Sequence, residues 1–187
     1  MGRCRRRTGV AWPRGQQLDL KKYIRDIPDF PTRGTLFRDI TPLLQNAGAF
    51  RAVIDALADY CVRQAADTIV GIDARGFLFS APVAYRLGKP LVPVRKRGKL
   101  PFDTHRAAYT LEYGDDTIEI HKDGIAPGDR TVIVDDLLAT GGTMSAAAKL
   151  VERTGGVVTG VGVVVELTEL RGRARLGGYD VHSLVQY

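Results

Sequence analysis

The spacing of apolar residues predicts an amphipathic helix over residues 49–65. Apolar side chains recur there at intervals of three and four residues, and charged side chains occupy the opposite face of the same helix. The apolar positions are Phe50, Val53, Ile54, Leu57, Ala58, Cys61 and Val62, and the charged ones are Arg51, Asp55, Asp59 and Arg63.

The next segments alternate between short apolar runs and helical patterns. Residues 68–72 form a run rich in β-branched side chains that stops at Asp73, residues 77–87 have helical spacing, and residues 91–94 are again apolar. Strand, helix and strand in this order indicate a parallel sheet covered by helices. The pattern recurs with a strand at 131–134, a helix from about 143 to 153 and a Val-rich strand at 157–165, and residues 182–186 close the sheet. We therefore predict an α/β fold with helices on both faces of the sheet.

Two segments interrupt this alternation. The segment from Ile27 to Thr41 contains Pro28, Pro31 and Gly34, so it cannot form one helix or a central strand. Residues 95–116 begin with a basic cluster and end in alternating residues, which predicts a β-hairpin turning around Gly114, Asp115 and Asp116. An excursion of this length from a compact core is typical of a lid or a binding loop.

Length and composition fit one globular domain, with 44% hydrophobic and 26% charged residues among 187. The net charge of +6 is unevenly distributed, because residues 1–17 hold five arginines and no acidic residue. The remaining chain carries only +1. We expect residues 1–17 to be a disordered basic arm and residues 18–187 to be the domain, and nucleic-acid binding by the arm is the less favoured alternative.

The few cysteines and histidines exclude several classes of protein. Cys4 and Cys61 lie far apart, and the three histidines are scattered, so neither a disulfide framework nor a zinc or multi-histidine centre is expected. No apolar run has the length of a secretory signal or a membrane span. These features predict a cytoplasmic protein that does not bind membranes.

Residues 132–143 carry the clearest chemical pattern. An apolar strand ends in Asp135 and Asp136, and a glycine-containing turn follows and opens a helix. Backbone N–H groups at such a turn bind phosphate, and two carboxylates at a strand's carboxyl end accept hydrogen bonds from ribose hydroxyls. The pattern indicates a ribose-5-phosphate site, although an aspartate pair that only caps a turn is the alternative. It is neither a Walker loop nor a dinucleotide fingerprint.

This stretch resembles the phosphoribosyl-diphosphate signature of the type I phosphoribosyltransferases, and other pieces narrow the resemblance to the adenine phosphoribosyltransferases. Those pieces span about Leu18 to Tyr187 and include residues 28–40, 71–77, 95–101 and 111–114. The resemblance implies the phosphoribosyltransferase fold with a flexible hairpin hood over about residues 95–120. Ala74, where many relatives have Ser, is a mild departure.

The resemblance assigns roles to individual residues. Glu112 and Arg75 are implied as catalytic, with Glu112 exchanging a proton with the adenine ring, and the Asp73–Ala74 peptide is implied to be cis. Arg95 and Lys99 are favoured over Lys96 and Arg97 for pyrophosphate, although sequence alone does not separate the four. The adenine-binding residues implied are Leu36, Phe37, Arg38 and Leu137. The phosphoribosyl-diphosphate-binding residues implied are Asp73, Ala74, Arg75, Arg95, Lys99, Tyr113, Asp135, Asp136, Ala139, Thr140, Gly141, Gly142 and Thr143.

The implied reaction joins adenine and phosphoribosyl diphosphate to give AMP and pyrophosphate, a pentosyl transfer of purine salvage. Mg²⁺ is the implied cofactor, held mainly through substrate and water and not by a protein metal site. A homodimer is expected. Two alternatives stay open: a ligand-sensing regulator that keeps the fold without catalysis, and a transferase for a 6-oxopurine. The second is disfavoured because Leu137 and Leu138 stand where such a pocket usually offers a cationic donor.

Overall fold

The computed structural model describes residues 18–111 and 114–187. The chain divides into two compact units, one ending at Ala52 and the other running from Val53 to Tyr187. The division falls within helix α2 (Ala47–Arg63).

The first unit contains a two-stranded antiparallel sheet. Strands β1 (Arg25–Pro28) and β2 (Leu36–Asp39) pair with Pro28 opposite Leu36, and they lie between the 3-10 helix η1 (Leu20–Tyr23) and helix α1 (Thr41–Gln45). The Arg25 Nη2 atom lies 2.9 Å from Asp39 Oδ2 across the pair. The proline- and glycine-containing segment therefore forms short strands and a loop, as its composition predicts.

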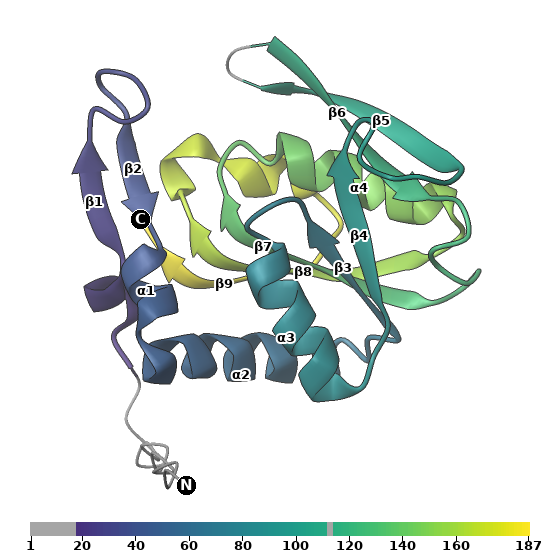
Figure 1. Ribbon diagram of the computed structural model, residues 1–187, viewed down its shortest axis with the longest axis horizontal. Coiled ribbons are helices and arrows are strands. Elements are labelled where there is room, and N and C mark those ends of the chain that lie inside the picture. Colours follow the sequence, from purple (N-terminus) through teal and green to yellow (C-terminus); the bar gives the residue numbers. More distant parts are fainter. Residues whose placement is uncertain (1–17, 112–113) are drawn as a thin grey trace, which may run out of the picture. The chain divides into compact units, whose positions relative to one another are not determined.

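The second unit is built on a seven-stranded sheet in the order β5–β6–β4–β3–β7–β8–β9 (Figure 1). The five strands from β4 to β9 in this order are parallel, and β6 and β5 add an antiparallel hairpin beside β4. The strands are β3 (Thr68–Ile72), β4 (Leu91–Lys96), β5 (Thr104–Leu111), β6 (Gly114–His121), β7 (Arg130–Leu138), β8 (Val157–Glu166) and β9 (Val181–Gln186). Two 3-10 helices, η2 (Thr168–Leu170) and η3 (Gly172–Leu176), connect β8 to β9.

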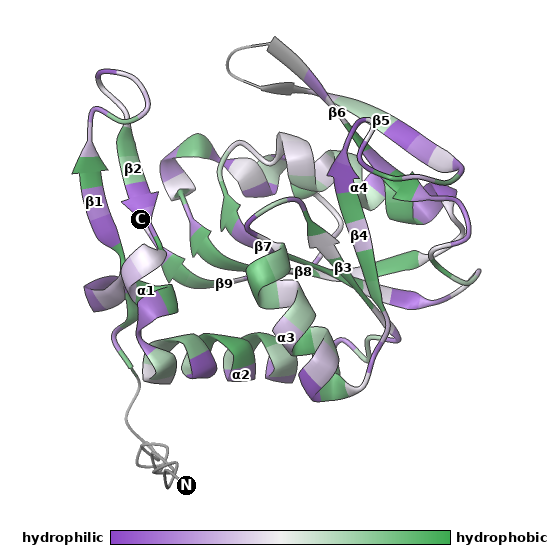
Figure 2. Ribbon diagram, viewed as in Figure 1, coloured by the Kyte–Doolittle hydropathy of each residue, from purple (hydrophilic) through white to green (hydrophobic). Residues whose placement is uncertain are grey.

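Alternating side chains of the strands pack against helices on the two faces of the sheet. Helix α4 (Gly142–Arg153) buries Leu150 and Val151 in one core with Ile133 and Val163. On the other face Leu57 of α2 lies against β8, and helix α3 (Phe77–Leu87) packs on β3 with Phe79 fully buried. Figure 2 shows that the central strands are largely hydrophobic along their length, as expected for parallel strands covered on both faces.

The predicted hairpin exists, but its turn was placed two residues too late. Leu111 pairs with Gly114, and Tyr109 pairs with Asp116, so residues 114–116 belong to β6. Their residue types favour turns, yet the cross-strand pairing includes them. In the described part of the chain, no helix combines the length and apolar composition that crossing a bilayer requires.

Candidate active site

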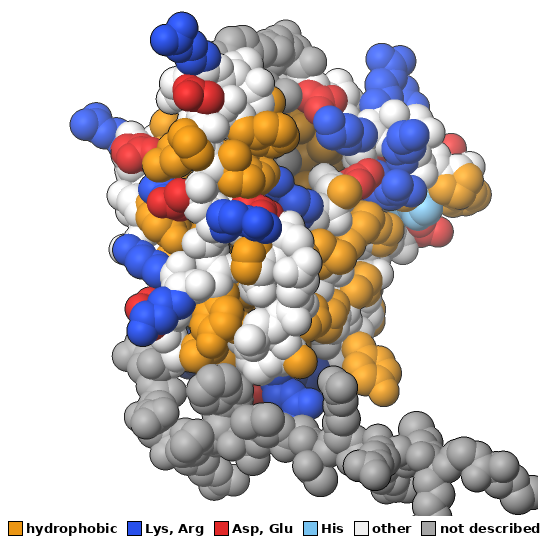
Figure 3. All heavy atoms as spheres, turned by 60° about the vertical axis from the view of Figure 1, so that its left-hand side comes forward, with side chains coloured by type: hydrophobic (Ala, Val, Ile, Leu, Met, Phe, Trp, Pro, Cys, Tyr) orange, Lys and Arg blue, Asp and Glu red, His pale blue; other side chains and the backbone are white. Residues whose placement is uncertain are grey.

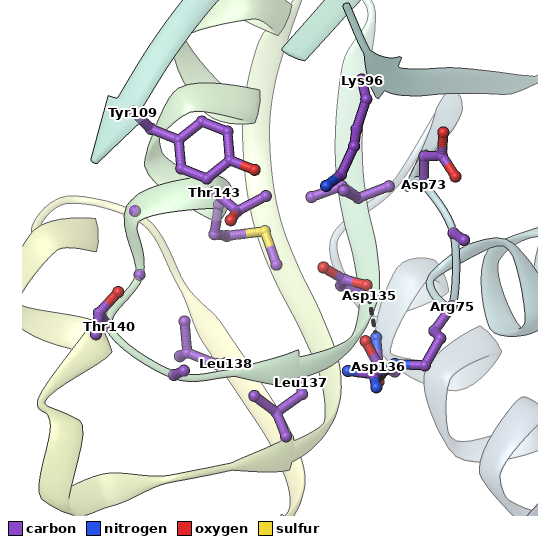
Figure 4. Close-up of a pocket in the computed structure, with 16 residues that line it drawn as sticks. Asp73, Arg75, Lys96, Tyr109, Asp135, Asp136, Leu137, Leu138, Thr140 and Thr143 are labelled. Atoms are coloured by element: carbon purple, nitrogen blue, oxygen red, sulfur yellow. Dashed lines mark hydrogen bonds and ion pairs between the residues drawn. The ribbon is translucent and has the colours of Figure 1, made fainter. Parts of the chain in front are cut away.

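The main cavity lies at the carboxyl end of the parallel strands of the second unit. Its volume is about 470 Å³, and its wall combines the end of β7, the turn into α4, the loop after β3 and two residues of the hairpin region (Figure 4). The lining residues are Ile72, Asp73, Ala74, Arg75, Lys96, Tyr109, Asp135, Asp136, Leu137, Leu138, Ala139, Thr140, Gly141, Gly142, Thr143 and Met144. The structure thus brings together most of the phosphate- and ribose-binding residues expected from sequence.

The two adjacent carboxylates occupy different environments. Asp135 Oδ1 accepts a hydrogen bond of 2.8 Å from the Asp136 backbone N–H. Burial, followed by the negative charge of Asp136, raises the pKa of Asp135 well above the ordinary aspartate value. Asp136 is only 6% exposed, and its Oδ2 atom lies 2.6 Å from Arg75 Nε. The pair is therefore more enclosed than a simple turn cap and already holds one cation.

The turn after β7 is held by a backbone contact with η3. Gly141 has φ +79°, and a Cβ atom built there would lie 2.4 Å from the Gly172 carbonyl oxygen. A Cβ atom at Gly172 would in turn lie 2.3 Å from the Ala139 carbonyl oxygen. The first N–H groups of α4 have no acceptors within the helix, so this turn presents donors to the cavity. Gly172 was missed in the sequence because nothing in its local pattern indicates this distant contact.

The loop after β3 lies close to the carboxylates. The Asp73–Ala74 peptide bond is cis, which confirms the implied geometry. A Cβ atom at Gly76 would lie 2.6 Å from Asp135 Oδ1, so only a residue without a side chain allows this approach. The resulting wall places Arg75 across the cavity from the phosphate-binding turn (Figure 4).

The basic cluster contributes a different residue from the two favoured in the sequence. Lys96 lines the cavity, and its Nζ atom lies 3.1 Å from Asp116 Oδ2, an interaction that raises the pKa of Lys96. Arg95 Nε lies 3.2 Å from Asp73 Oδ2, and Arg95 Nη1 donates to the Lys99 carbonyl oxygen. Arg95 and Lys99 do not line this cavity, and their contact with pyrophosphate stays a prediction.

Tyr109 is a second residue that sequence analysis did not select. Its hydroxyl donates a 3.3 Å hydrogen bond to Asp116, and burial raises its pKa. Figure 4 shows its ring beside Thr143, at the edge of the cavity opposite Arg75. The alternation of polar and apolar residues along the predicted strand ending at Tyr113 was the only sequence feature that could have indicated Tyr109. It does not show which face of the strand contacts a ligand.

The implied adenine-binding residues of β2 belong to the first unit. Phe37 packs edge-on against Phe30 with ring centroids 5.1 Å apart, and Arg38 forms an ion pair with Asp26. Leu137, the fourth implied residue, lines the cavity of the second unit. Glu112 and Tyr113 lie outside the described residues.

The cavity offers carboxylate oxygens to a metal ion that a phosphorylated substrate would carry. Among residues 18–111 and 114–187, no group of three or more His, Cys, Asp or Glu side chains could hold a metal ion. Asp135 and Asp136 provide two carboxylates at one point, which fits Mg²⁺ because this ion keeps several water and phosphate ligands.

Comparison with known proteins agrees with this geometry. Residues 41–183 match the family model of the phosphoribosyl transferase domain. The adenine phosphoribosyltransferase of Solibacter usitatus is 57% identical over 169 residues, covering 90% of this chain and 98% of that protein. The crystal structure of adenine phosphoribosyltransferase from Thermoanaerobacter pseudethanolicus has a TM-score of 0.87 and 55% identity, covering 90% of this chain and 98% of its own.

A more distant relative was crystallised with ligands. The adenine phosphoribosyltransferase of Saccharomyces cerevisiae, in complex with adenine and an imino-altritol bisphosphate, has a TM-score of 0.84 and 41% identity. It aligns with 88% of this chain and 96% of its own. The fold and the family model define the class as phosphoribosyltransferases. Within that class the chain belongs to the adenine phosphoribosyltransferase family, and both the expected fold and the expected enzyme class are confirmed.

Proposed function

We propose that the main cavity transfers the 5-phosphoribosyl group from phosphoribosyl diphosphate to adenine, giving AMP and pyrophosphate. The observation that carries this proposal is the meeting of Asp135, Asp136 and the turn at residues 139–143 at one end of the sheet. The two carboxylates can accept hydrogen bonds from ribose hydroxyls, and the N–H groups of the turn can bind the 5-phosphate. Together they match the two ends of a ribose-5-phosphate. The reaction itself is inferred from the relatives, which are named adenine phosphoribosyltransferases.

Ribose and its phosphate would lie along β7 and the start of α4. The ribose hydroxyls donate to Asp135 and Asp136, and the 5-phosphate accepts hydrogen bonds from residues 139–143. Thr140 and Thr143 add hydroxyl donors to those of the backbone. Donors that are already oriented toward a ligand stabilise it at little cost in reorganisation.

Pyrophosphate would leave toward the loop of residues 73–75. Arg75 stabilises the developing negative charge there, and its 2.6 Å contact with Asp136 positions its guanidinium at the same edge. Lys96 lines this side of the cavity and joins Arg95, Lys99 and Tyr113 as a proposed contact.

Leu137, which lines the main cavity, is a proposed contact to adenine. The family resemblance adds Leu36 and Phe37 of the first unit as proposed contacts to the base. Arg38 is a proposed contact to the base, and Glu112 is proposed to exchange a proton with the ring as N9 forms the new bond. Leu137 and Leu138 offer no donor to a 6-oxo group, which favours adenine over hypoxanthine or guanine. Closure of the hairpin over the cavity would exclude water, which would otherwise hydrolyse the activated sugar.

Mg²⁺ is the proposed cofactor, held through substrate oxygens and water near Asp135 and Asp136. When bound, it neutralises charge on the phosphates of phosphoribosyl diphosphate. The residues described above bind, orient and enclose the substrate around it.

The test is AMP formation by the purified protein with adenine, hypoxanthine, guanine or xanthine. Adenine should be converted, and the 6-oxopurines should react at least about 100-fold more slowly, since a mismatched polar group in a built pocket costs that much or more. A preference for hypoxanthine or guanine would contradict the base assignment while leaving the ribose-phosphate site intact.

We further propose a cytoplasmic homodimer. Its support is exposed apolar surface in the second unit, where the α3 side chains Leu78 and Tyr85 are 43% and 90% exposed. Figure 3 likewise shows hydrophobic side chains reaching the surface among charged ones. Light scattering should give twice the 20.4 kDa mass of the chain, and Tyr85→Lys should lower that mass if α3 lies in the interface.

A further inference from the structure

A second cavity lies beside the main one in the second unit. Its volume is about 330 Å³, and three separate elements line it: β5, α4 and η3. That volume falls within the range of small-molecule sites. We call it the α4 pocket, defined by Tyr109, Ser145, Ala146, Lys149 and Arg175.

The α4 pocket carries uncompensated positive charge. Lys149 and Arg175 both line it, and no hydrogen bond or ion pair joins either side chain to another residue in the ranges 18–111 and 114–187. The carboxylate one turn along α4, on Glu152, instead accepts a 2.7 Å hydrogen bond from the Tyr179 hydroxyl. Two cations that face one cavity, with no partner among these described residues, attract an anion.

Hydrogen-bond donors and apolar surface accompany this charge. Ser145 and Lys149 are four residues apart on α4 and therefore share one face of the helix. Ala146 and the Tyr109 ring supply apolar wall on either side. A guanidinium, an ammonium and a hydroxyl beside such a wall suit a phosphate group attached to a small organic molecule.

The two cavities share part of their lining. Tyr109 and Gly142 line both cavities. Arg153 Nη1 donates a 2.8 Å hydrogen bond to the Arg106 carbonyl oxygen, which joins α4 to β5 beside the α4 pocket. The α4 pocket thus belongs to the α4–β5 contact. It shares Tyr109 and Gly142 with the main cavity but contains neither Asp135 nor Asp136.

We propose that the α4 pocket binds a second phosphorylated small molecule, in addition to the substrate of the main cavity. Lys149 and Arg175 are its anion-binding residues, and Ser145 donates a further hydrogen bond. The phosphate arrives either as a free inorganic anion or as part of a nucleotide, and both share the chemistry that these three residues recognise.

The experiment is competitive lysine labelling with an amine-reactive acylating reagent, read by peptide mass spectrometry. Lys149 reports on the α4 pocket, Lys96 on the main cavity, and the exposed Lys89 on bulk surface. The probes are inorganic pyrophosphate and AMP, each at constant ionic strength. At ten times its dissociation constant a bound probe should slow labelling of Lys149 about tenfold, and labelling of Lys89 should not change.

Two variants locate the protection. Arg175→Gln should abolish protection of Lys149 and leave protection of Lys96 intact, whereas the matched control Arg171→Gln, on the same segment but not in the α4 pocket, should change neither. If pyrophosphate protects Lys149 from labelling, the α4 pocket binds a free anion. If only AMP protects Lys149, the α4 pocket binds a nucleotide. Unchanged labelling of Lys149 with both probes would overturn the proposal, even where Lys96 is protected. Equal protection of Lys149 in Arg175→Gln would also overturn it.

Discussion

Asp135 combines a proposed role in binding with a location that disfavours its charged form. Its carboxylate is enclosed beside a second carboxylate, and both burial and the Asp136 charge raise its pKa. A carboxyl group whose pKa is raised by folding stabilises the fold while it is protonated, and this stability is lost as the pH rises through the folded-state pKa. Above that pKa, the ionised Asp135 destabilises the protein relative to a neutral side chain.

We expect Asp135→Asn to raise the unfolding temperature at pH 7–8 while weakening phosphoribosyl diphosphate binding. The gain in unfolding temperature should shrink as the pH falls toward about 4, the ordinary aspartate value, because wild-type Asp135 is protonated there. Thermal unfolding from pH 4 to 8 measures this, and calorimetry measures substrate binding. Asp123→Asn, at an exposed position, is the control and should show no such pH dependence. A pH-independent gain in Asp135→Asn would contradict the raised pKa.

Glu112 carries the proposed acid–base role, and this prediction rests on the family resemblance alone. Glu112→Gln keeps the size of the side chain and one acceptor but cannot exchange a proton. We expect turnover to fall by about 10²–10⁴-fold, with a smaller effect on adenine affinity, whereas Glu112→Leu should weaken affinity as well. Steady-state kinetics on both variants decide this, and near-wild-type turnover in Glu112→Gln would move the proton transfer to another group or to solvent.

At the scale of elements, the phosphate-binding turn depends on η3. Gly141 and Gly172 bring two backbone segments closer than any Cβ atom would allow, although 31 positions separate them in the sequence. The turn is consequently shaped from both sides, by the start of α4 and by the backbone of η3. A small shift of η3 therefore moves donors that would contact the substrate.

Gly172→Ala should raise the KM for phosphoribosyl diphosphate clearly, while the unfolding temperature should change little. The added Cβ atom would lie 2.3 Å from the Ala139 carbonyl oxygen, so the turn must move. Displacing a binding group by about 1 Å can cost up to about 100-fold in rate. Gly177→Ala is the matched control, because its nearest neighbour would be 4.0 Å away. Equal kinetics for the two variants, measured with thermal unfolding as a check on folding, would argue against a shaping role for η3.

The elements that sequence predicts well are those with uniform periodicity. Strand β3 and helix α3 have the predicted bounds, since an apolar run ends at Asp73 and a helical pattern ends before Gly88. The apolar run at 131–134 was predicted to end in the two aspartates, yet β7 continues beyond Asp135 and Asp136 to Leu138. Its pairing with β8, where Asp135 lies opposite Val163, includes the polar residues that locally suggest an end.

The lining of the main cavity was predictable where one segment holds its parts, as in residues 135–143, whose role in binding stays a prediction. The position of Lys96 in the cavity wall was not predictable. A cluster of charged residues at the end of a strand has no alternation that would show which side chain faces the cavity. The direction of the Lys96 side chain depends on β4 pairing with β6, where Lys96 lies opposite Ile118. Gly172 was missed for the same reason, since its role exists only in the tertiary contact.

On the scale of the whole molecule, charge separates the chain into a basic arm and a nearly neutral body. Residues 1–17 hold five of the net +6 charges and none of the residues assigned to the main cavity. Their separation from a domain at 18–187 stays a prediction. The family model starts at residue 41, and the arm therefore lies outside the matched region.

Deleting residues 1–17 should leave turnover and substrate affinity unchanged and should lower retention on a polyanion column. Loss of five arginines removes most of the electrostatic attraction, which weakens with salt as counterion release requires. A full-length variant with Arg3, Arg5, Arg6, Arg7 and Arg14 replaced by Gln separates charge from length, and it should elute with the truncated protein. If the truncated protein folds but loses activity while the glutamine variant keeps it, the arm contributes to the site or to a subunit interface through its backbone or other side chains. If both lose activity, the arginines themselves contribute, and the boundary at residue 18 is wrong.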